Sequence, residues 1–364
     1  MATEVEKLEE EIVDLKNVED DDVDNEDEST SEDLFTITSY GVDHNVDGLV
    51  KRLRSENYYI PDFQRQYVWS QNDASKFIES LLLGLPVPGV FLYKEGDGPK
   101  HLVIDGQQRL KSLQKFYDGL FGEKKFKLTG IKTKWKDLGY ADLSEDDQLR
   151  LDDATIHATV FKQDTPSDNM DSVYEVFERI NTGGLKLSPQ EIRSCIAYGD
   201  FNTLLFSLND NIKWREIFGK KSNRLKDVEL ILRLFAFRDR LAVYRRPMKK
   251  FLSDYMKDRR SLNKVEMQEV RAIWEDSILK IRSSLGSRPF RPSGRALNVA
   301  FYDSFTVALS LKLQKGGEVS DDSVRRAYDK LQQDTEYLGW ISRSTADEEY
   351  VKNRFERAIK ALGD

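Results

Sequence analysis

The stretch Leu102-Val103-Ile104-Asp105-Gly106-Gln107-Gln108-Arg109-Leu110 decides the fold of the first half of this chain. Its apolar start is typical of a short buried strand. After Asp105-Gly106 the apolar positions change to a helical spacing, with Leu110, Leu113 and Phe116 on one side. The sequence therefore predicts a strand that passes directly into a helix at Gly106.

This junction is a candidate anion site, because the start of a helix presents backbone N–H groups and the positive end of its dipole. Gly106 allows a ligand to approach the backbone closely, and Arg109 can bind phosphate oxygens through two nitrogens. Gln107 and Gln108 can orient phosphates, a base or water. Asp105 is the candidate ligand for Mg²⁺ or the base that acts on water. The simpler alternative is that Asp105 only caps the helix while the glutamines are solvated.

Two further polar clusters can contribute to the same site. Residues 60–69 combine an arginine and two glutamines with three aromatic rings. Residues 174–188 contain Gly183 and Gly184, which are typical of a helix C-cap and turn. An arginine can hold a phosphate and an aromatic ring can stack on a base. The nucleotide-binding candidates from these clusters are Gln64, Arg65, Tyr67, Arg179, Asn181 and Thr182.

Coarse periodicity predicts two folded segments, with boundaries near 34–165 and 170–364. The first mixes short strands with helices and is expected to be α+β. Its predicted strands are 35–37, 90–93, 102–104, 126–128 and 155–161, and a helix with an apolar face is predicted from Ala74 to Leu82. The second segment has no strand candidate of comparable strength. Its predicted helices are 171–180, 188–198, 226–241, 265–285, 294–313, 321–335 and 346–361.

Residues 1–33 form a strongly acidic segment. They hold 16 acidic residues and two lysines, a formal charge of −14, so the remaining 54 basic and 48 acidic residues give residues 34–364 a charge of +6. Such a run is typical of a disordered, solubilising tail. A sharper hypothesis is that this polyanion folds back onto a basic surface and competes with nucleic acid.

Composition excludes several classes of protein. The one cysteine, Cys195, rules out an internal disulfide framework and a thiolate zinc cluster, and it fits a reducing compartment. The apolar runs are much shorter than the ~20 residues that a membrane-spanning helix needs. We therefore expect a cytoplasmic protein with no membrane role.

Three motifs resemble the N-terminal domain of GmrSD-type, modification-dependent restriction endonucleases. They are Ile60-Pro61-Asp62-Phe63-Gln64-Arg65 with Tyr67 and Trp69, then Ile104 to Leu110, then Phe177-Glu178-Arg179-Ile180-Asn181-Thr182-Gly183-Gly184 with Leu187-Ser188 and Gln190-Glu191. The resemblance implies a ParB/sulfiredoxin-like domain followed by helices. It also implies that Asp-Gly-Gln-Gln-Arg binds and hydrolyses a nucleoside triphosphate, often GTP, and couples this to DNA cleavage.

The chain departs from larger relatives, which carry a C-terminal HNH nuclease domain. An HNH site needs histidine, and the three histidines, His44, His101 and His157, all precede the helical segment. If DNA is cut, we expect a nuclease partner chain to cut it. A homo-oligomer also remains open.

Basic residues interleaved with aromatic ones make the helical segment the candidate DNA surface, although runs of this kind are more often solvated helix faces. The candidates are Lys220, Lys221, Arg224, Arg245, Arg246, Arg288 and Arg291.

We therefore predict a nucleoside-triphosphate-binding and hydrolysing regulator of a restriction or phage-defence system, with GTP favoured and Mg²⁺ as cofactor. Asp105, Gln107, Gln108 and Arg109 are its candidate catalytic residues. Two alternatives stay open: a ParB-like DNA-binding module that hydrolyses nothing, and a DNA-nicking nuclease in its own right.

Overall fold

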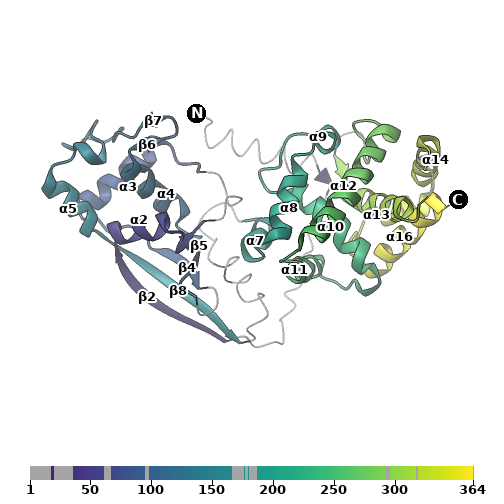
Figure 1. Cartoon of the computed structure of the whole chain (residues 1–364), viewed down its shortest axis with the longest axis horizontal. Helices are drawn as coiled ribbons and strands as arrows, with labels where there is room; N and C mark the ends of the chain where they lie inside the picture. The colour runs from purple at the N-terminus through teal and green to yellow at the C-terminus, as the bar shows by residue number, and fades with distance from the viewer. Residues whose placement is uncertain are drawn as a thin grey trace. The chain divides into compact units, whose positions relative to one another are not determined.

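The computed structural model of the chain describes residues 18–19, 36–60, 67–94, 98–165, 176, 179, 187–291, 296–316 and 319–363. The chain separates into two compact units. The sheet unit is Ser31–Leu187, and the helical unit is Ser188–Asp364 together with Met1–Thr30. Figure 1 shows the strands in the first unit and the long helices in the second.

The sheet unit is built on a five-stranded mixed sheet in the order β2-β8-β4-β5-β3. β2 runs antiparallel to β8 and β4 antiparallel to β5, whereas β4 is parallel to β8 and β3 is parallel to β5. The strands are β2 (Thr36–Asn45), β3 (Tyr58–Tyr59), β4 (Val90–Lys94), β5 (His101–Asp105) and β8 (Thr155–Thr165). A separate two-stranded hairpin joins β6 (Leu120–Phe121) to β7 (Lys124–Lys125).

Helices cover one face of this sheet and bury its core. They are α2 (Val46–Arg54), α3 (Gln71–Leu82), α4 (Gln107–Asp118) and α5 (Glu145–Asp153), with a 3₁₀ turn η1 (Tyr140–Asp142) before α5. Leu110, Leu113 and Phe116 of α4 are fully buried in one cluster with Leu92 and Val103 of the sheet. The predicted strand-to-helix change at Gly106 is therefore confirmed, and burial of this α4 face holds the helix against β5.

The helix predicted from Ala74 to Leu82 is confirmed as α3, which starts three residues earlier. Its N-cap is Ser70, whose hydroxyl accepts from the Asp73 backbone N–H at 3.2 Å while the Asp73 carboxylate accepts from the Ser70 N–H at 3.0 Å. This reciprocal capping fixes the start of the helix.

The strand predicted at 126–128 is wrong. The segment has no regular structure, although Phe126 and Leu128 are buried. Their backbone N–H groups donate to Gly119 O at 2.8 Å and Leu138 O at 2.9 Å, which lie in loops. The alternation of apolar residues correctly indicated burial, but no strand lies alongside to pair with the segment.

The helical unit is mainly α-helical, as predicted, and its core contains the buried rings of Trp214 and Trp274 with centroids 5.3 Å apart. Its helices are α7 (Pro189–Ile196), α8 (Asp200–Asn209), α9 (Ile212–Phe218), α10 (Lys226–Arg240), α11 (Met248–Asp258), α12 (Lys264–Leu285), α13 (Val299–Gln314), α14 (Asp321–Gln332), α15 (Thr335–Trp340) and α16 (Glu348–Gly363), with a 3₁₀ turn η3 (Leu241–Val243). Within the described ranges, no helix has the length and apolar character needed to cross a lipid bilayer.

Two details of this unit differ from expectation. The helix predicted at 294–313 starts later, because Asn298 caps α13 by accepting from the Phe301 N–H at 2.8 Å. The unit also contains one short strand that was not predicted, β9 (Leu297–Asn298), which pairs with β1 (Val18–Glu19) from the acidic segment. Apart from that strand, the prediction that residues 1–33 are disordered lies outside the described residues.

A fully buried ion pair joins two central helices of this unit. Arg233 of α10 donates through Nε and Nη2 to Asp303 Oδ2 of α13, at 2.9 and 2.7 Å. The two residues are 1% and 0% exposed, so neither charge is hydrated. Removing Asp303 would leave the buried Arg233 charge with a more distant carboxylate, Glu229 Oε1, at 3.8 Å from its Nη1.

We expect Asp303→Leu to lower the free energy of unfolding by about 3–5 kcal/mol, because Arg233 then loses its main counter-charge. The double variant Arg233→Met/Asp303→Leu should recover most of that loss, since neither charge of this pair remains and Glu229 keeps Arg193 and Lys226 as counter-charges. Urea denaturation followed by circular dichroism measures both changes. The exposed pair Arg240–Asp258, at 2.8 Å, is the control, and Asp258→Ala should cost less than about 1 kcal/mol. Equal losses in the single and double variants would contradict this account.

Candidate functional site

The junction between β5 and α4 is shaped by Gly106. This residue is the N-cap of α4, its backbone is left-handed with φ 97° and ψ 6°, and the cap makes no side-chain hydrogen bond. The simpler interpretation, in which Asp105 caps the helix, is therefore wrong. Because glycine has no side-chain acceptor, the cap residue itself does not satisfy the N–H groups of the first turn, which is where anions bind to helices.

A side chain at position 106 would not fit. A Cβ there would lie 2.5 Å from Val90 Cγ1 and 3.3 Å from Arg109 Nη2. The left-handed backbone adds strain for any residue with a Cβ. Glycine thus lets β4, β5 and α4 approach one another at this point.

Arg109 lies beside Gly106, as a phosphate-binding role requires. Its Nη2 donates to Gly89 O and to Asp105 Oδ2, at 2.8 Å in each case. Its Nε is buried without a hydrogen-bond partner, and 15% of the side chain is exposed. The guanidinium is therefore anchored at the junction and already neutralised by one carboxylate.

Asp105 is the more accessible partner of this pair, with 44% of its side chain exposed. Mg²⁺ in nucleotide sites is commonly held by one or two carboxylates together with phosphates and water. Asp105 fits such a role as a single carboxylate ligand. Because it also accepts from Arg109, a bound triphosphate and its metal would have to share or replace the Asp105–Arg109 contact.

Gln108 connects the junction to the segment that follows residues 61–66. Its Oε1 accepts from the backbone N–H groups of Val68 at 3.0 Å and Trp69 at 3.3 Å. The alternative in which this glutamine is simply solvated is wrong. Gln108 therefore positions part of the first motif against α4.

A second contact ties the same two segments together. The Tyr67 hydroxyl lies 2.7 Å from Ser112 Oγ, which itself donates to Gln108 O at 2.7 Å. Since the serine proton is used there, Tyr67 is the donor to Ser112. Lys115 Nζ lies 4.8 Å from the centroid of the Tyr67 ring, and burial raises the pKa of this tyrosine.

The structure describes only some of the candidate site residues. Gln64, Arg65, Asn181 and Thr182 lie outside the described residues, so the expectation that Arg65 and Arg109 both bind the phosphates stays a prediction. Arg179 is an exposed helical residue, and Gln107 is the first residue of α4. The nucleotide-binding and catalytic roles of all these residues stay predictions.

Several candidate DNA-binding residues take part in contacts within the helical unit. Lys221 pairs with Asp210, Arg224 Nε lies 3.4 Å from Glu191 Oε2, and Arg245 Nη1 lies 3.7 Å from Glu348 Oε2. The Arg246 N–H donates to Glu348 Oε1 at 3.1 Å. Lys220 and Arg288 are exposed, whereas Arg291 is partly buried. Their contact with DNA stays a prediction.

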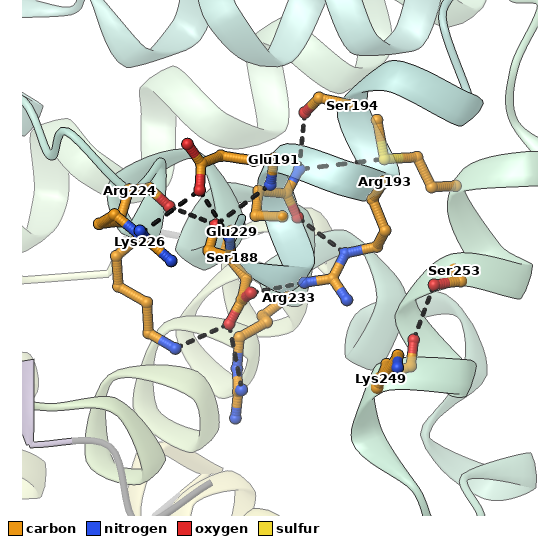
Figure 2. A network of polar contacts seen from close by, with 12 residues as sticks. Ser188, Glu191, Arg193, Ser194, Arg224, Lys226, Glu229, Arg233, Lys249 and Ser253 are labelled. Carbon is orange, nitrogen blue, oxygen red and sulfur yellow. Dashed lines mark hydrogen bonds and ion pairs between the residues drawn. The ribbon is translucent and has the colours of Figure 1, made fainter. Parts of the chain in front are cut away.

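Sequence reasoning missed a network of buried charges in the helical unit, shown in Figure 2. Arg193 donates from Nη2 to Glu229 Oε2 at 2.5 Å, and Lys226 Nζ lies 2.8 Å from Glu229 Oε1. Burial alone would raise the pKa of Glu229, but Lys226, Arg193 and Arg233 outweigh it and hold that pKa below its usual range. Burial also lowers the pKa of Lys226.

This network starts at the third motif and stabilises its last helix. Ser188 caps α7, accepting from the Glu191 N–H at 3.2 Å while Glu191 Oε2 accepts from the Ser188 N–H at 2.5 Å. This capping box starts α7 and confirms the helix predicted at 188–198. The remaining buried charges could have been noticed in the sequence. Lys226, Glu229 and Arg233 are charged residues at helical spacing within an otherwise apolar helix.

The described residues contain no cluster of three or more histidine, cysteine, aspartate or glutamate side chains that could bind a metal. Each histidine contacts a partner of its own. His44 Nε2 lies 2.7 Å from the Tyr58 hydroxyl, His101 Nδ1 lies 2.9 Å from Pro99 O, and His157 Nδ1 lies 2.8 Å from Asp43 Oδ1. These contacts give no support to a histidine-based nuclease site in the described residues.

The junction, the first motif and the start of α7 all fall inside one family match. Residues 46–198 match the model of the GmrSD restriction endonuclease, N-terminal domain. The predicted resemblance is confirmed for this GmrSD-matching segment.

One curated relative is an uncharacterized protein of Methanocaldococcus jannaschii. It is 33% identical over 93 residues, which cover 19% of this chain and 16% of the relative. The chain thus matches only a small part of that protein. No solved structure matches this chain.

Gln108→Ala should loosen residues 67–70, because the backbone N–H groups of Val68 and Trp69 lose their shared acceptor. We expect hydrogen exchange of these two amides to become about tenfold faster, the equivalent of roughly one hydrogen bond. Gln114→Ala, on the same helix, is the matched control and should leave both amides unchanged. Unaltered exchange in Gln108→Ala would show that this glutamine does not position the segment.

Proposed function

We propose that this chain binds a nucleoside triphosphate with Mg²⁺ at the β5–α4 junction and acts as a regulator subunit of a DNA restriction or phage-defence system. GTP is the favoured nucleotide, and a separate nuclease chain cuts the DNA. The observation that carries the proposal is the placement of the Arg109 guanidinium beside a glycine-capped helix start.

Each residue of the junction has a proposed role. The N–H groups of the first turn of α4 bind phosphate oxygens, and Arg109, helped by Arg65, neutralises their charge. Gln107 orients the phosphates or the attacking water. Asp105 holds Mg²⁺, which supplies charge neutralisation when bound.

The contact between Asp105 and Arg109 suggests how binding is controlled. Without nucleotide, the carboxylate neutralises the guanidinium at 2.8 Å. A triphosphate offers Arg109 a more highly charged acceptor, while Mg²⁺ offers Asp105 a cation in exchange. Nucleotide and metal should therefore bind together. The triphosphate replaces Asp105 as the partner of Arg109, and Mg²⁺ replaces Arg109 as the partner of Asp105.

Arg109→Ala should weaken triphosphate binding by about 10- to 100-fold, the equivalent of one or two charge-assisted hydrogen bonds. Asp105→Asn should act differently. Binding in the absence of Mg²⁺ should be unchanged or tighter, because Arg109 loses its competing carboxylate, while the gain in affinity from Mg²⁺ should be lost.

Isothermal titration calorimetry with a non-hydrolysable GTP analogue, with Mg²⁺ or EDTA, measures both effects. Arg54→Ala is the control, because Arg54 pairs with Asp118 near the other end of α4. Circular dichroism verifies that each variant is folded. Equal affinity for the wild type and Arg109→Ala would refute the assignment of the site.

A non-hydrolysing DNA-binding module is the second candidate function, and the internal pairing of Arg109 with Asp105 is compatible with it. Phosphate release from each nucleoside triphosphate, with and without DNA, separates the two. Release that depends on Arg109 supports hydrolysis, whereas DNA binding without any release supports the module. Incubation of supercoiled plasmid with Mg²⁺ or Mn²⁺ tests for nicking by the chain itself.

A further inference from the structure

A short strand of the acidic N-terminal segment pairs with the helical unit. β1 lies parallel to β9, with Val18 opposite Leu297 and Glu19 opposite Asn298. Figure 1 draws β1 as a small purple arrow within that unit. The acidic segment is thus attached to one defined place on the helical unit rather than to its surface at large.

β9 is joined to a basic loop. The Asn298 N–H donates to Phe290 O at 2.7 Å, and the fully buried Phe290 ring fixes the loop in the core. Arg288 and Arg291 flank this residue. The strand that receives the acidic segment is therefore hydrogen-bonded to a loop that carries two arginines.

Among the described residues, neither of these arginines has a counter-charge. Arg291 donates to Pro289 O at 3.2 Å and Phe218 O at 3.1 Å, and its Nε is buried with no hydrogen-bond partner. Burial, and then the charge of Arg288, lower the pKa of Arg291. In the parts of the chain that the structure describes, no carboxylate pairs with either arginine. An anion at this loop would relieve the repulsion between them.

The acidic run is close enough to supply that anion. Asp20, Asp21 and Asp22 follow Glu19 directly. Glu19 lies opposite Asn298, and the Asn298 N–H donates to Phe290 O. Each of these two contacts spans about one strand spacing, so β1 and the loop are at most about 10 Å apart. Three residues of extended chain span up to about 10 Å.

We propose that the acidic run at residues 19–22 docks on Arg288 and Arg291 and competes in cis with nucleic acid phosphate for this loop. The docking stands on the strand pairing and on charge complementarity, whereas the competition rests on the proposed DNA contact. DNA, with its higher charge density, would displace the run, and the β1–β9 pairing would keep it nearby for return.

A cross-linking experiment on the full chain tests the docking without DNA. Arg288→Lys keeps the positive charge and provides an amine that a zero-length carbodiimide couples to carboxylates in direct contact. Mass spectrometry should find position 288 joined to residues 19–22 in at least about tenfold higher yield than Lys352, an exposed lysine of α16, since only a lasting ion pair brings the groups together.

Two further results decide the proposal. The cross-link should weaken strongly in about 1 M salt, where the screening length is about 3 Å. Equal yields at position 288 and Lys352, or no product at position 288, would overturn the docking.

The competition is tested by the affinity of the full chain for a short DNA duplex. Neutralising the docking run with Glu19→Gln, Asp20→Asn, Asp21→Asn and Asp22→Asn should raise the affinity several-fold. The matched control changes the same amount of charge earlier in the sequence than β1, through Glu6→Gln, Glu9→Gln, Glu10→Gln and Glu11→Gln. Equal gains in the two variants would overturn competition at this loop. If no form binds DNA, the proposed DNA contact fails, and the cross-link alone decides the docking.

Discussion

The sheet unit depends on the steric constraint at Gly106. A Cβ at this position would come within 2.5 Å of Val90 Cγ1, so the chain can turn from β5 into α4 here only without a side chain. The close approach brings Gly89 O and the Asp105 carboxylate within hydrogen-bonding distance of the Arg109 guanidinium. The same constraint that shapes the fold therefore places a guanidinium beside the first turn of a helix.

The first and second motifs are joined by side chains that also form the candidate site. Gln108 accepts two backbone N–H groups from residues about forty positions earlier in the chain, and Tyr67 donates to Ser112 on the next turn of α4. Gln108, a candidate catalytic residue in the sequence, thus also holds the neighbouring segment in place. Substitution of such a residue would alter activity through position even if it never touched the nucleotide.

The strand-to-helix change at Gly106 could be predicted because it rests on local periodicity. Helical spacing did not predict the pairing of Asp105 with Arg109, because Asp105 is the last residue of β5 and precedes the first residue of α4. The strand expected at 126–128 failed because an apolar pattern reports burial and carries no information about a pairing partner. Short helices such as α9 (Ile212–Phe218) were missed because seven residues give too little periodicity to recognise.

The buried network of the helical unit shows a different limit. Arg193 and Glu229 are 36 residues apart, and Arg233 and Asp303 are 70 apart. The sequence shows that charges interrupt an apolar helix, but only the packing of α7, α10 and α13 shows which charges meet. Local chemistry is therefore more predictable in this chain than long-range pairing.

The central claim is that a triphosphate binds against the backbone at the start of α4. Hydrogen exchange of single amides, measured by NMR with Mg²⁺ and a non-hydrolysable GTP analogue, tests it directly. The account predicts slower exchange at Gly106, Gln107 and Gln108, with little change at Leu110, whose N–H already donates to Gly106 O at 2.9 Å. Binding that protects other amides and leaves these three unchanged would contradict it.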